Sequence, residues 1–349
     1  MKKVGIVTLF GLYNFGNRLQ NYAVQEIIKS YGFDVQTIIS SEIQPKSYLK
    51  FWLKSIKNGT LVRSLKFRRF NRKYISTYIV HGYPELFPEE ISNEFKYFVV
   101  GSDQVWNPDI RQTQRENFFL SFAHKQQRIA ISPSIAVSSI PDKWRDSFIN
   151  GLDGFTHISV RENNSVELIS ELTGQQAIVL ADPTMIIPKE RWQSIERQVK
   201  KLSSHYLLSL FLGKVDEKRK EEIATLASDN KLEIIDLNSK KWIGIGPDEF
   251  LYLVHHADIV CTDSFHCLVF SILYNRSFVA FDRCIVSDKD INGRTGSRID
   301  TLLQKFSSNT YVQNEEQELI VNKFSEETVK NVLGKERKKY SEFLKSQLV

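Results

Sequence analysis

Short apolar runs alternate with amphipathic runs along almost the whole chain, and this alternation constrains the fold more than any other feature. It predicts parallel sheets with helices on both faces, the α/β class. The expected strands cover residues 4–10, 35–39, 97–100, 128–132, 157–160, 177–180, 206–211, 232–237, 259–261 and 278–281. The expected helices cover residues 17–31, 141–149, 165–173, 216–230, 247–255, 266–274 and 298–306, with one or two more in 325–348.

The length of 349 residues exceeds what one ordinary core supports, so two domains are expected. We predict two doubly wound, Rossmann-like domains that face each other across a cleft. The first covers 1–185 and the second 186–324. The tail, 325–349, is expected to be helical and to pack back on the first half.

Composition excludes several classes of protein. We find no run of eighteen or more apolar residues, so no membrane span is expected. The apolar start of the chain is too short for a signal peptide and is interpreted as the first strand. Cys261, Cys267 and Cys284 have no metal-ligand spacing, and an odd number argues against a disulfide framework. A reducing, cytoplasmic location fits this pattern.

The segment 43–84 is basic and holds no acidic residue, within a chain of net charge +6. Apolar side chains are interleaved with the basic ones, as in a helix that lies on anionic lipid. A solvated helical insertion with its apolar face on the protein is the alternative, and nucleic acid is the least favoured partner. The basic residues are Lys46, Lys50, Lys54, Lys57, Arg63, Lys66, Arg68, Arg69, Arg72 and Lys73.

His266 stands where an expected strand, 259–261, passes into an expected helix, 266–274. Ligands of open α/β sheets collect at this edge. The backbone N–H groups and the positive dipole end of the helix favour an anion beside the imidazole. This combination suggests group transfer from a phosphorylated donor.

Five short motifs occur in a fixed order: GLYNFGNRLQNYA at 11–23, GSDQVWNP at 101–108, ISVRE at 158–162, ADPT at 181–184 and TDSFH at 262–266. Together they resemble the polysaccharide pyruvyl transferase family, from about residue 4 to about residue 306. The resemblance implies a fold like the two-domain GT-B glycosyltransferases. It also implies transfer of pyruvate from phosphoenolpyruvate to two hydroxyls of a sugar, forming a cyclic ketal. The acceptors would be lipid-linked or nucleotide-linked precursors of capsule, exopolysaccharide or cell-wall glycans.

The resemblance assigns two residues. The family's histidine corresponds to His266, and an arginine that follows a strand in the first half corresponds to Arg161. Many members carry an arginine within the motif that precedes this histidine, but here Ser264 and Phe265 stand there without a basic residue. Another cation must then hold the donor, and Arg283, Arg294 and Arg298 are candidates. No cofactor or metal is required.

The chemistry suggests roles for the remaining motif residues. His266 is the expected general acid/base, since imidazole titrates near neutrality, and guanidinium groups suit a carboxylate and a phosphate. Asp103 is expected to deprotonate an acceptor hydroxyl, or else to cap the following turn. Expected donor ligands are Arg161, Arg294, Arg298, Ser264 and Phe265. Expected acceptor ligands are Asn14, Gly16, Asn17, Gln20, Ser102 and Gln104.

Structural roles compete with several of these assignments. Arg161 could instead form a salt bridge with Glu162, and Asp263 is expected to cap the helix that begins near His266. His255 and His256, at the end of a helix, are interpreted as structural. Two other functions remain open: a GT-B glycosyltransferase that uses a nucleotide sugar, and a glycan-binding protein without catalysis.

Overall fold

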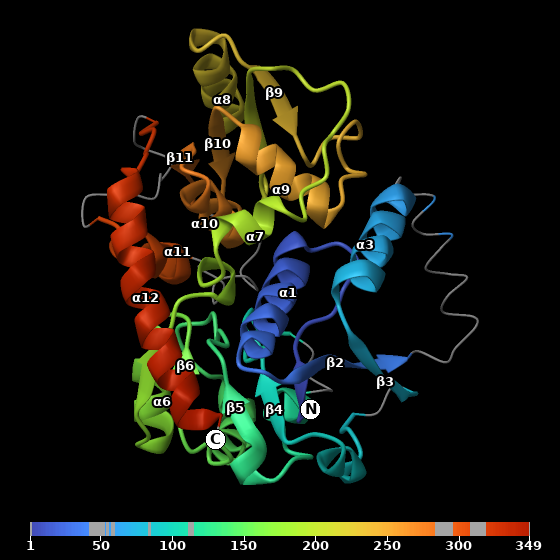
Figure 1. Cartoon of the computed structure of the whole chain (residues 1–349). Coiled ribbons are helices and arrows are strands. Elements are labelled where there is room, and N and C mark those ends of the chain that lie inside the picture. The colour runs from blue at the N-terminus through green and yellow to red at the C-terminus, as the bar shows by residue number, and fades with distance from the viewer. Residues whose placement is uncertain are drawn as a thin grey trace. The chain divides into compact units, whose positions relative to one another are not determined.

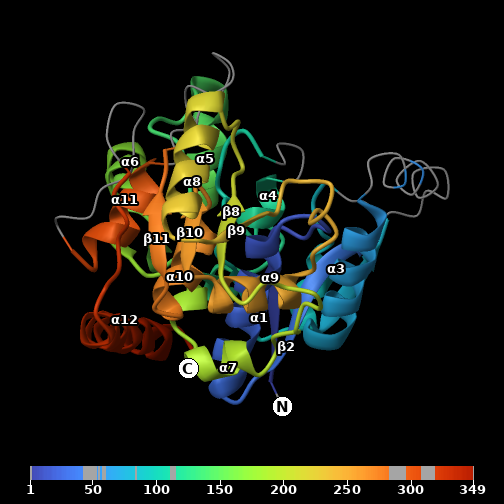
Figure 2. The ribbon, with the colours of Figure 1, turned by 90° about the horizontal axis from the view of Figure 1, so that it is seen from above.

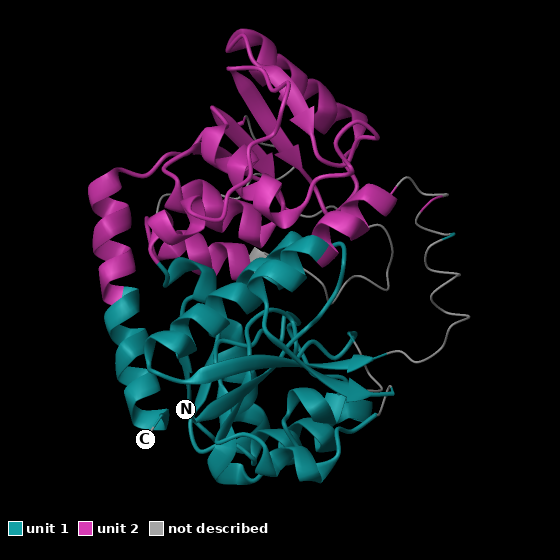
Figure 3. Ribbon diagram, turned by 45° about the vertical axis from the view of Figure 1, so that its right-hand side comes forward, with its two compact units in different colours: residues 1–54, 69–187, 336–349 teal, residues 55–68, 188–335 magenta. Residues whose placement is uncertain are grey.

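The computed structural model describes residues 2–41, 53, 56, 60–82, 85–110, 115–282, 296–307 and 319–348. The chain divides into two compact units (Figure 3). Unit 1 contains Met1–Lys54, Arg69–Ile187 and Glu336–Val349, and unit 2 contains Ser55–Arg68 and Pro188–Lys335. Each unit is built on a parallel β-sheet with flanking helices, so the expected α/β class is confirmed (Figure 1).

Unit 1 holds a five-stranded parallel sheet of order β3-β2-β1-β4-β5. Its strands are β1 (Lys3–Val7), β2 (Asp34–Ser41), β3 (Thr77–His81), β4 (Tyr97–Val100) and β5 (Arg128–Ala130). A two-stranded parallel sheet of β6 (Ile158–Val160) and β7 (Ala177–Val179) completes the unit. The strands β1 and β4 are almost wholly buried because helices cover both faces. Because β1, β4 and β5 are parallel neighbours, their carboxyl ends lie side by side at one edge of the sheet.

Helices of unit 1 pack on opposite faces of this sheet. The helix α1 (Phe15–Ser30) covers one face, where Asn21 and Gln25 bond the hydroxyl of Thr37 in β2. The other face carries an aromatic core in which Trp106 is 1% exposed and stacks on Phe119. The further helices are α4 (Arg115–Phe118), α5 (Asp142–Leu152) and α6 (Asn163–Thr173), with short 3-10 turns at Glu89–Asn93, Lys125–Gln127 and Pro183–Met185.

Unit 2 holds a four-stranded parallel sheet of order β11-β10-β8-β9. The strands are β8 (Tyr206–Leu210), β9 (Glu233–Asp236), β10 (Ile259–Thr262) and β11 (Ser277–Ala280). The helix α8 (Glu217–Asp229) lies on one face, against Leu207 and Cys261. On the other face lie α9 (Pro247–His256) and α10 (Phe265–Leu273), as Figure 2 shows. The remaining helices are α7 (Lys189–Gln193) and α11 (Gly296–Gln304).

Two helices contain residues of both units. The tail forms one helix, α12 (Glu326–Gln347), whose residues from Glu336 onward belong to unit 1. There the Arg337 guanidinium donates to the Ile186 carbonyl, at 2.8 Å, so the tail packs on the first half as expected. The helix α3 (Leu61–Tyr74) is the described part of the basic segment, and its residues up to Arg68 belong to unit 2.

The structure differs from the sequence expectation within the segment 43–84. The strand β3 lies there and pairs with β2, although only a helical insertion was expected. Lys46, Lys50, Lys54 and Lys57 lie outside the described residues. None of the described helices combines the length and the apolar composition that a membrane-spanning helix needs.

Candidate active site

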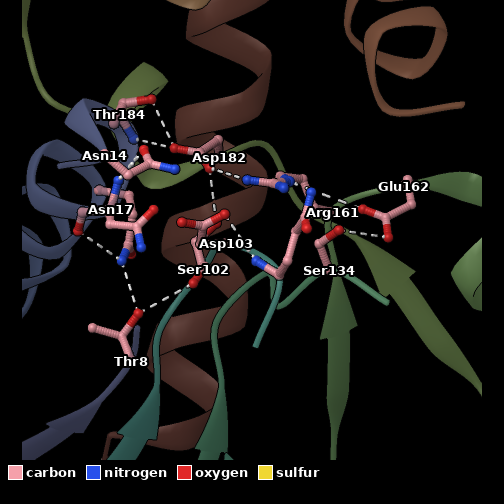
Figure 4. A network of polar contacts seen from close by, with 12 residues as sticks. Thr8, Asn14, Asn17, Ser102, Asp103, Ser134, Arg161, Glu162, Asp182 and Thr184 are labelled. Carbon is pink, nitrogen blue, oxygen red and sulfur yellow. Dashed lines mark hydrogen bonds and ion pairs between the residues drawn. The ribbon is translucent and has the colours of Figure 1, made fainter. Parts of the chain in front are cut away.

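Asp182 joins three segments of unit 1 at the carboxyl edge of the sheet (Figure 4). Its side chain is 1% exposed and follows β7. Oδ2 accepts hydrogen bonds from Ser102 Oγ, at 2.8 Å, and from Arg161 Nη1, at 2.9 Å. Oδ1 accepts from the backbone N–H and the hydroxyl of Thr184, at 3.0 and 2.7 Å. Arg161 is thus part of a buried ion pair, and its assignment as a donor ligand stays a prediction.

Glu162 is a second buried carboxylate in the same network. Oε1 accepts from the Ser134 hydroxyl at 2.9 Å, and from the backbone N–H groups of Ile135 and Ala136 at 2.9 and 3.0 Å. The Ser165 hydroxyl donates to the same oxygen, at 2.7 Å. The nearest approach of Glu162 to the Arg161 guanidinium is 3.9 Å. Glu162 therefore fixes the loop after β5, while Asp182 is the closer ionic partner of Arg161.

Asp103 follows β4 in a left-handed backbone conformation, with φ of 75°. Its carbonyl accepts the N–H groups of Val105 and Ser134, and Oδ1 accepts the N–H of Gln104 at 2.9 Å. Oδ2 is buried and makes no hydrogen bond to any described residue. A strained, non-glycine residue with an unsatisfied carboxylate oxygen is typical of a functional position.

The first strand-to-helix loop lies in the same network. Asn14 is exposed and caps α1, with its Oδ1 accepting the N–H of Asn17 at 3.2 Å. Gln20 is fully buried and donates to the Thr8 hydroxyl at 2.8 Å. Thr8 in turn donates to the carbonyl of Ser102 at 3.3 Å. The structure therefore links Asn14, Asn17 and Gln20 to Ser102, and Gly16 is buried in the first turn of the helix.

Arg18 is a buried cation of this loop that the sequence analysis did not single out. Its guanidinium is fully buried, donates to the Leu9 carbonyl and to Asn21, and lies 4.0 Å from the Phe10 ring centroid. Desolvation lowers the pKa of Arg18 to about 9, and the charge of Asp103 opposes this shift. The only signal in the sequence was its place inside the 11–23 motif.

In unit 2 the segment that carries His266 is fixed by Asp263. The two carboxylate oxygens accept the N–H groups of Leu212 and Gly213, at 2.7 and 2.8 Å. These groups belong to the loop after β8, so Asp263 joins two neighbouring strand ends. The expectation that Asp263 caps this helix is therefore wrong. Ser264 occupies the N-cap of α10, and its side chain makes no capping hydrogen bond.

His266 lies in the first turn of α10 and is 8% exposed, with Phe265 packed edge-on at a centroid distance of 5.3 Å. Ser264 is 7% exposed and donates its N–H to the Thr262 hydroxyl, at 3.0 Å. Arg298 is 5% exposed on α11, a helix that packs against α10. Arg283 and Arg294 lie outside the described residues.

The site residues expected from the sequence thus fall into two groups. The group of unit 1 consists of Asn14, Gly16, Asn17, Gln20, Ser102, Asp103 and Arg161, with Gln104 half-buried beside it. The group of unit 2 consists of Ser264, Phe265, His266 and Arg298. Both lie at carboxyl ends of parallel strands, where open α/β sheets bind their ligands.

Comparison with known proteins identifies a family. The profile described as "Polysaccharide pyruvyl transferase" matches residues 14–284, most of the chain. A search of curated proteins found no match.

Similar solved structures include a glycosyltransferase from Rickettsia africae (TM-score 0.46, 13% identity, 99% of each chain covered). They also include a UDP-GlcNAc 2-epimerase from Neisseria meningitidis bound to UDP-GlcNAc (TM-score 0.46, 11% identity, covering 99% of this chain and 100% of that chain). A third is Arabidopsis thaliana UGT89C1 complexed with UDP-L-rhamnose (TM-score 0.43, 8% identity, covering 97% of this chain and 91% of that chain).

Proposed function

Because the chain belongs to the polysaccharide pyruvyl transferase family, we propose that it moves pyruvate from phosphoenolpyruvate onto two hydroxyls of a sugar. The sugar is part of a surface-glycan precursor, the product is a cyclic ketal, and phosphate is released. The observation that carries this proposal is the position of His266. It stands in the first turn of α10, directly after the strand end that Asp263 ties to its neighbour.

The chemistry requires one group that both gives and takes a proton. Protonation of the methylene carbon of phosphoenolpyruvate leaves oxocarbenium character at the central carbon. A sugar hydroxyl attacks this carbon and loses its proton, the bond between the carbon and the phosphate oxygen breaks, and a second hydroxyl attacks the same carbon and closes the ring. Of the two hydroxyl protons, one balances the proton given to the methylene carbon and the other leaves with the phosphate. Imidazole suits this sequence because its unperturbed pKa lies near neutrality. We assign to His266 the proton given to the methylene carbon and the proton taken from one hydroxyl, and the rigid strand end keeps its ring in place.

We assign the donor's negative groups to Arg298 in preference to Arg161. The guanidinium of Arg161 pairs with Asp182 at 2.9 Å and belongs to unit 1, whereas His266 belongs to unit 2. Arg298 belongs to the same unit as His266 and lies on the helix that packs against α10. A planar guanidinium matches two oxygens of a carboxylate or phosphate at once.

We assign the acceptor hydroxyls to the unit 1 group. The carboxylate of Asp103 can accept a hydroxyl proton through Oδ2, which has no hydrogen-bond partner among the described residues. Asn14 is exposed and can donate to a second hydroxyl through its amide nitrogen. Ser102 contributes by holding Asp182 rather than by direct contact, since its hydroxyl donates to that carboxylate.

The test is phosphate release from phosphoenolpyruvate in the presence of glycan precursors. His266→Gln should lower kcat by about 10²- to 10⁴-fold, the usual contribution of general acid-base catalysis. The exposed His157→Gln is the matched control and should leave the rate unchanged. Asp103→Asn keeps the left-handed backbone and an oxygen for Gln104, and it should also lower kcat. Equal rates for His266→Gln and wild type would remove His266 from the mechanism.

A ligand comparison separates the proposal from its rivals. Phosphoenolpyruvate should raise the thermal unfolding midpoint of the protein, because a ligand that binds only the native state stabilises it. Stabilisation by nucleotide sugars alone would favour a glycosyltransferase. Binding of glycans without phosphate release would favour a protein that lacks catalysis.

We further propose that the reaction takes place in the cytoplasm, at the inner face of the membrane, on an acceptor that carries lipid. One stripe of α3 supports this. Val62 and Leu65 are 51% and 50% exposed. Arg69, Arg72 and Lys73 follow on the same side at helical spacing, while Phe67 and Phe70 face the protein. Apolar residues that insert and basic residues that meet phosphates are typical of helices on anionic lipid.

Lys66 also lies on this side of α3, four residues after Val62, but its ammonium group pairs with Glu249 at 2.6 Å. The test therefore changes Arg69, Arg72 and Lys73 to glutamine together. Each basic residue near an anionic surface contributes about 1 kcal/mol, so binding to phosphatidylserine vesicles should fall by at least tenfold. The charge-matched control changes three exposed lysines on other helices, Lys29, Lys143 and Lys189. Equal sedimentation of both variants with vesicles would refute the membrane role.

A further inference from the structure

A carboxylate and two imidazoles converge in unit 2, outside the groups discussed above. Glu196 follows α7, and His255 and His256 end α9. One possible ligand atom from each of the three residues lies within 4.8 Å of the others. Two imidazoles and a carboxylate form the donor set that zinc and related first-row cations prefer.

The carboxylate of Glu196 is largely shielded from solvent, because its side chain is only 9% exposed. Both oxygens lie 3.1 Å from Nδ1 of His255, and Oε2 takes part in a hydrogen bond with it. Oε1 is buried, and the Tyr274 phenol also interacts with this carboxylate. A cation placed between this carboxylate and Nδ1 would satisfy both oxygens, which a single N–H cannot do.

The two imidazole rings are held in fixed orientations. Nδ1 of His256 lies 2.9 Å from the Tyr252 carbonyl, and the Tyr252 ring stacks on it with centroids 4.1 Å apart. Donation from Nδ1 leaves the lone pair on Nε2, the arrangement usual for a metal-bound histidine. The His255 ring stacks on Tyr274 at 4.4 Å, with Gln193 opposite its Nε2 at 3.3 Å.

The surroundings favour a positive charge at this position. The two histidines occupy the last turn of α9, where the helix dipole is negative. His256 is exposed, so an ion can enter from solvent, and it also lines a cavity of about 440 Å³ with Lys200, Ser203 and Tyr206.

We propose that Glu196, His255 and His256 bind a divalent cation of the zinc type. The ion takes the place of the proton on Nδ1 of His255, which passes to the buffer. It also binds the Glu196 carboxylate and Nε2 of His256. Three protein ligands leave a fourth position for water or for a small anion from the cavity. The ion ties the segment after α7 to the end of α9, so its expected role is to stabilise unit 2.

The test is titration calorimetry of the full chain with ZnCl₂ after treatment with a chelator. Wild type should bind one equivalent with release of about one proton, seen as a dependence of the heat on the buffer. Glu196→Gln and His256→Ala should weaken binding at least tenfold. His205→Ala, which removes the 71% exposed imidazole near Asp258, is the matched control and should bind like wild type.

The thermal midpoint, measured with Zn²⁺ and with Mg²⁺, tests the same site without calorimetry. Zn²⁺ should raise the thermal midpoint of wild type and of the His205→Ala control but not of the two ligand variants, while Mg²⁺, which prefers oxygen ligands, should have no effect. Equal zinc affinity in wild type and His256→Ala would overturn the proposal, as would absence of stoichiometric binding. Neither outcome bears on the pyruvyl transfer reaction, because the readouts do not use activity.

Discussion

Replacement of Asp263 by asparagine tests how the His266 segment is held. The carboxylate is 1% exposed and accepts two backbone N–H groups, from Leu212 at 2.7 Å and from Gly213 at 2.8 Å. Hydrogen bonds to a charged acceptor contribute about 1.5–3 kcal/mol each. Asparagine keeps one oxygen, turns one bond into a neutral one and places an NH₂ group against the other N–H. The free energy of unfolding should therefore fall by about 2–4 kcal/mol.

The assay is urea unfolding followed by circular dichroism, together with amide hydrogen exchange. Asp216→Asn is the control, because Asp216 caps α8 by accepting the Arg219 N–H, and asparagine caps as well. This control should stay within about 0.5 kcal/mol of wild type. Exchange at Leu212 and Gly213 should quicken only in Asp263→Asn. Unchanged stability and unchanged exchange in that variant would refute the argument that Asp263 joins the two strand ends.

Four other outcomes follow from the described residues. Asp182→Asn removes the closer of the two carboxylates beside the buried Arg161 cation and leaves only Glu162, at 3.9 Å, so urea unfolding should show a loss of about 3 kcal/mol. Burial raises the pKa of Cys267 to about 12 and that of Cys261 further, so mass spectrometry should find neither thiol alkylated in native protein at pH 8. Because these folded-state values exceed the thiol's ordinary 9.0, stability should fall as the pH rises from 9 towards 12. Gly334 lies inside α12, and beyond its own helix backbone no atom of a described residue lies within 4 Å of a Cβ placed there, so Gly334→Ala should raise the thermal midpoint, by about 0.5–1 kcal/mol in stability.

Strand and helix positions could be predicted from the sequence because each element has its own apolar pattern. The expected helix 216–230 and the observed α8 differ by one residue at each end, for example. The strand β3 escaped prediction for a physical reason. Ile79 is 51% exposed in this edge strand, so the run of buried residues that marks a central strand is missing.

Partners of buried charges could not be predicted, because they are distant in sequence. Asp263 binds N–H groups 51 and 50 residues away, and Lys66 pairs with Glu249 across 183 residues. A single sequence records that such residues are charged, but not which groups neutralise them. For this reason the sequence suggested a helix cap for Asp263 and left open whether Lys66 meets lipid or solvent.

Backbone strain in unit 1 gives an independent reason to assign Asp103 to the site. Asp103, Ser132 and Ala136 all have positive φ although none is glycine, and all follow β4 or β5. Each such residue costs about 1–3 kcal/mol, which the hydrogen bonds of Glu162 and of the Asp103 carbonyl offset. A glycine at 103 would adopt φ of 75° without this cost, but it would lack a carboxylate. Asp103→Gly should therefore retain the fold and lose phosphate release. If that variant remained active, the strain at this position would be a feature of the turn alone.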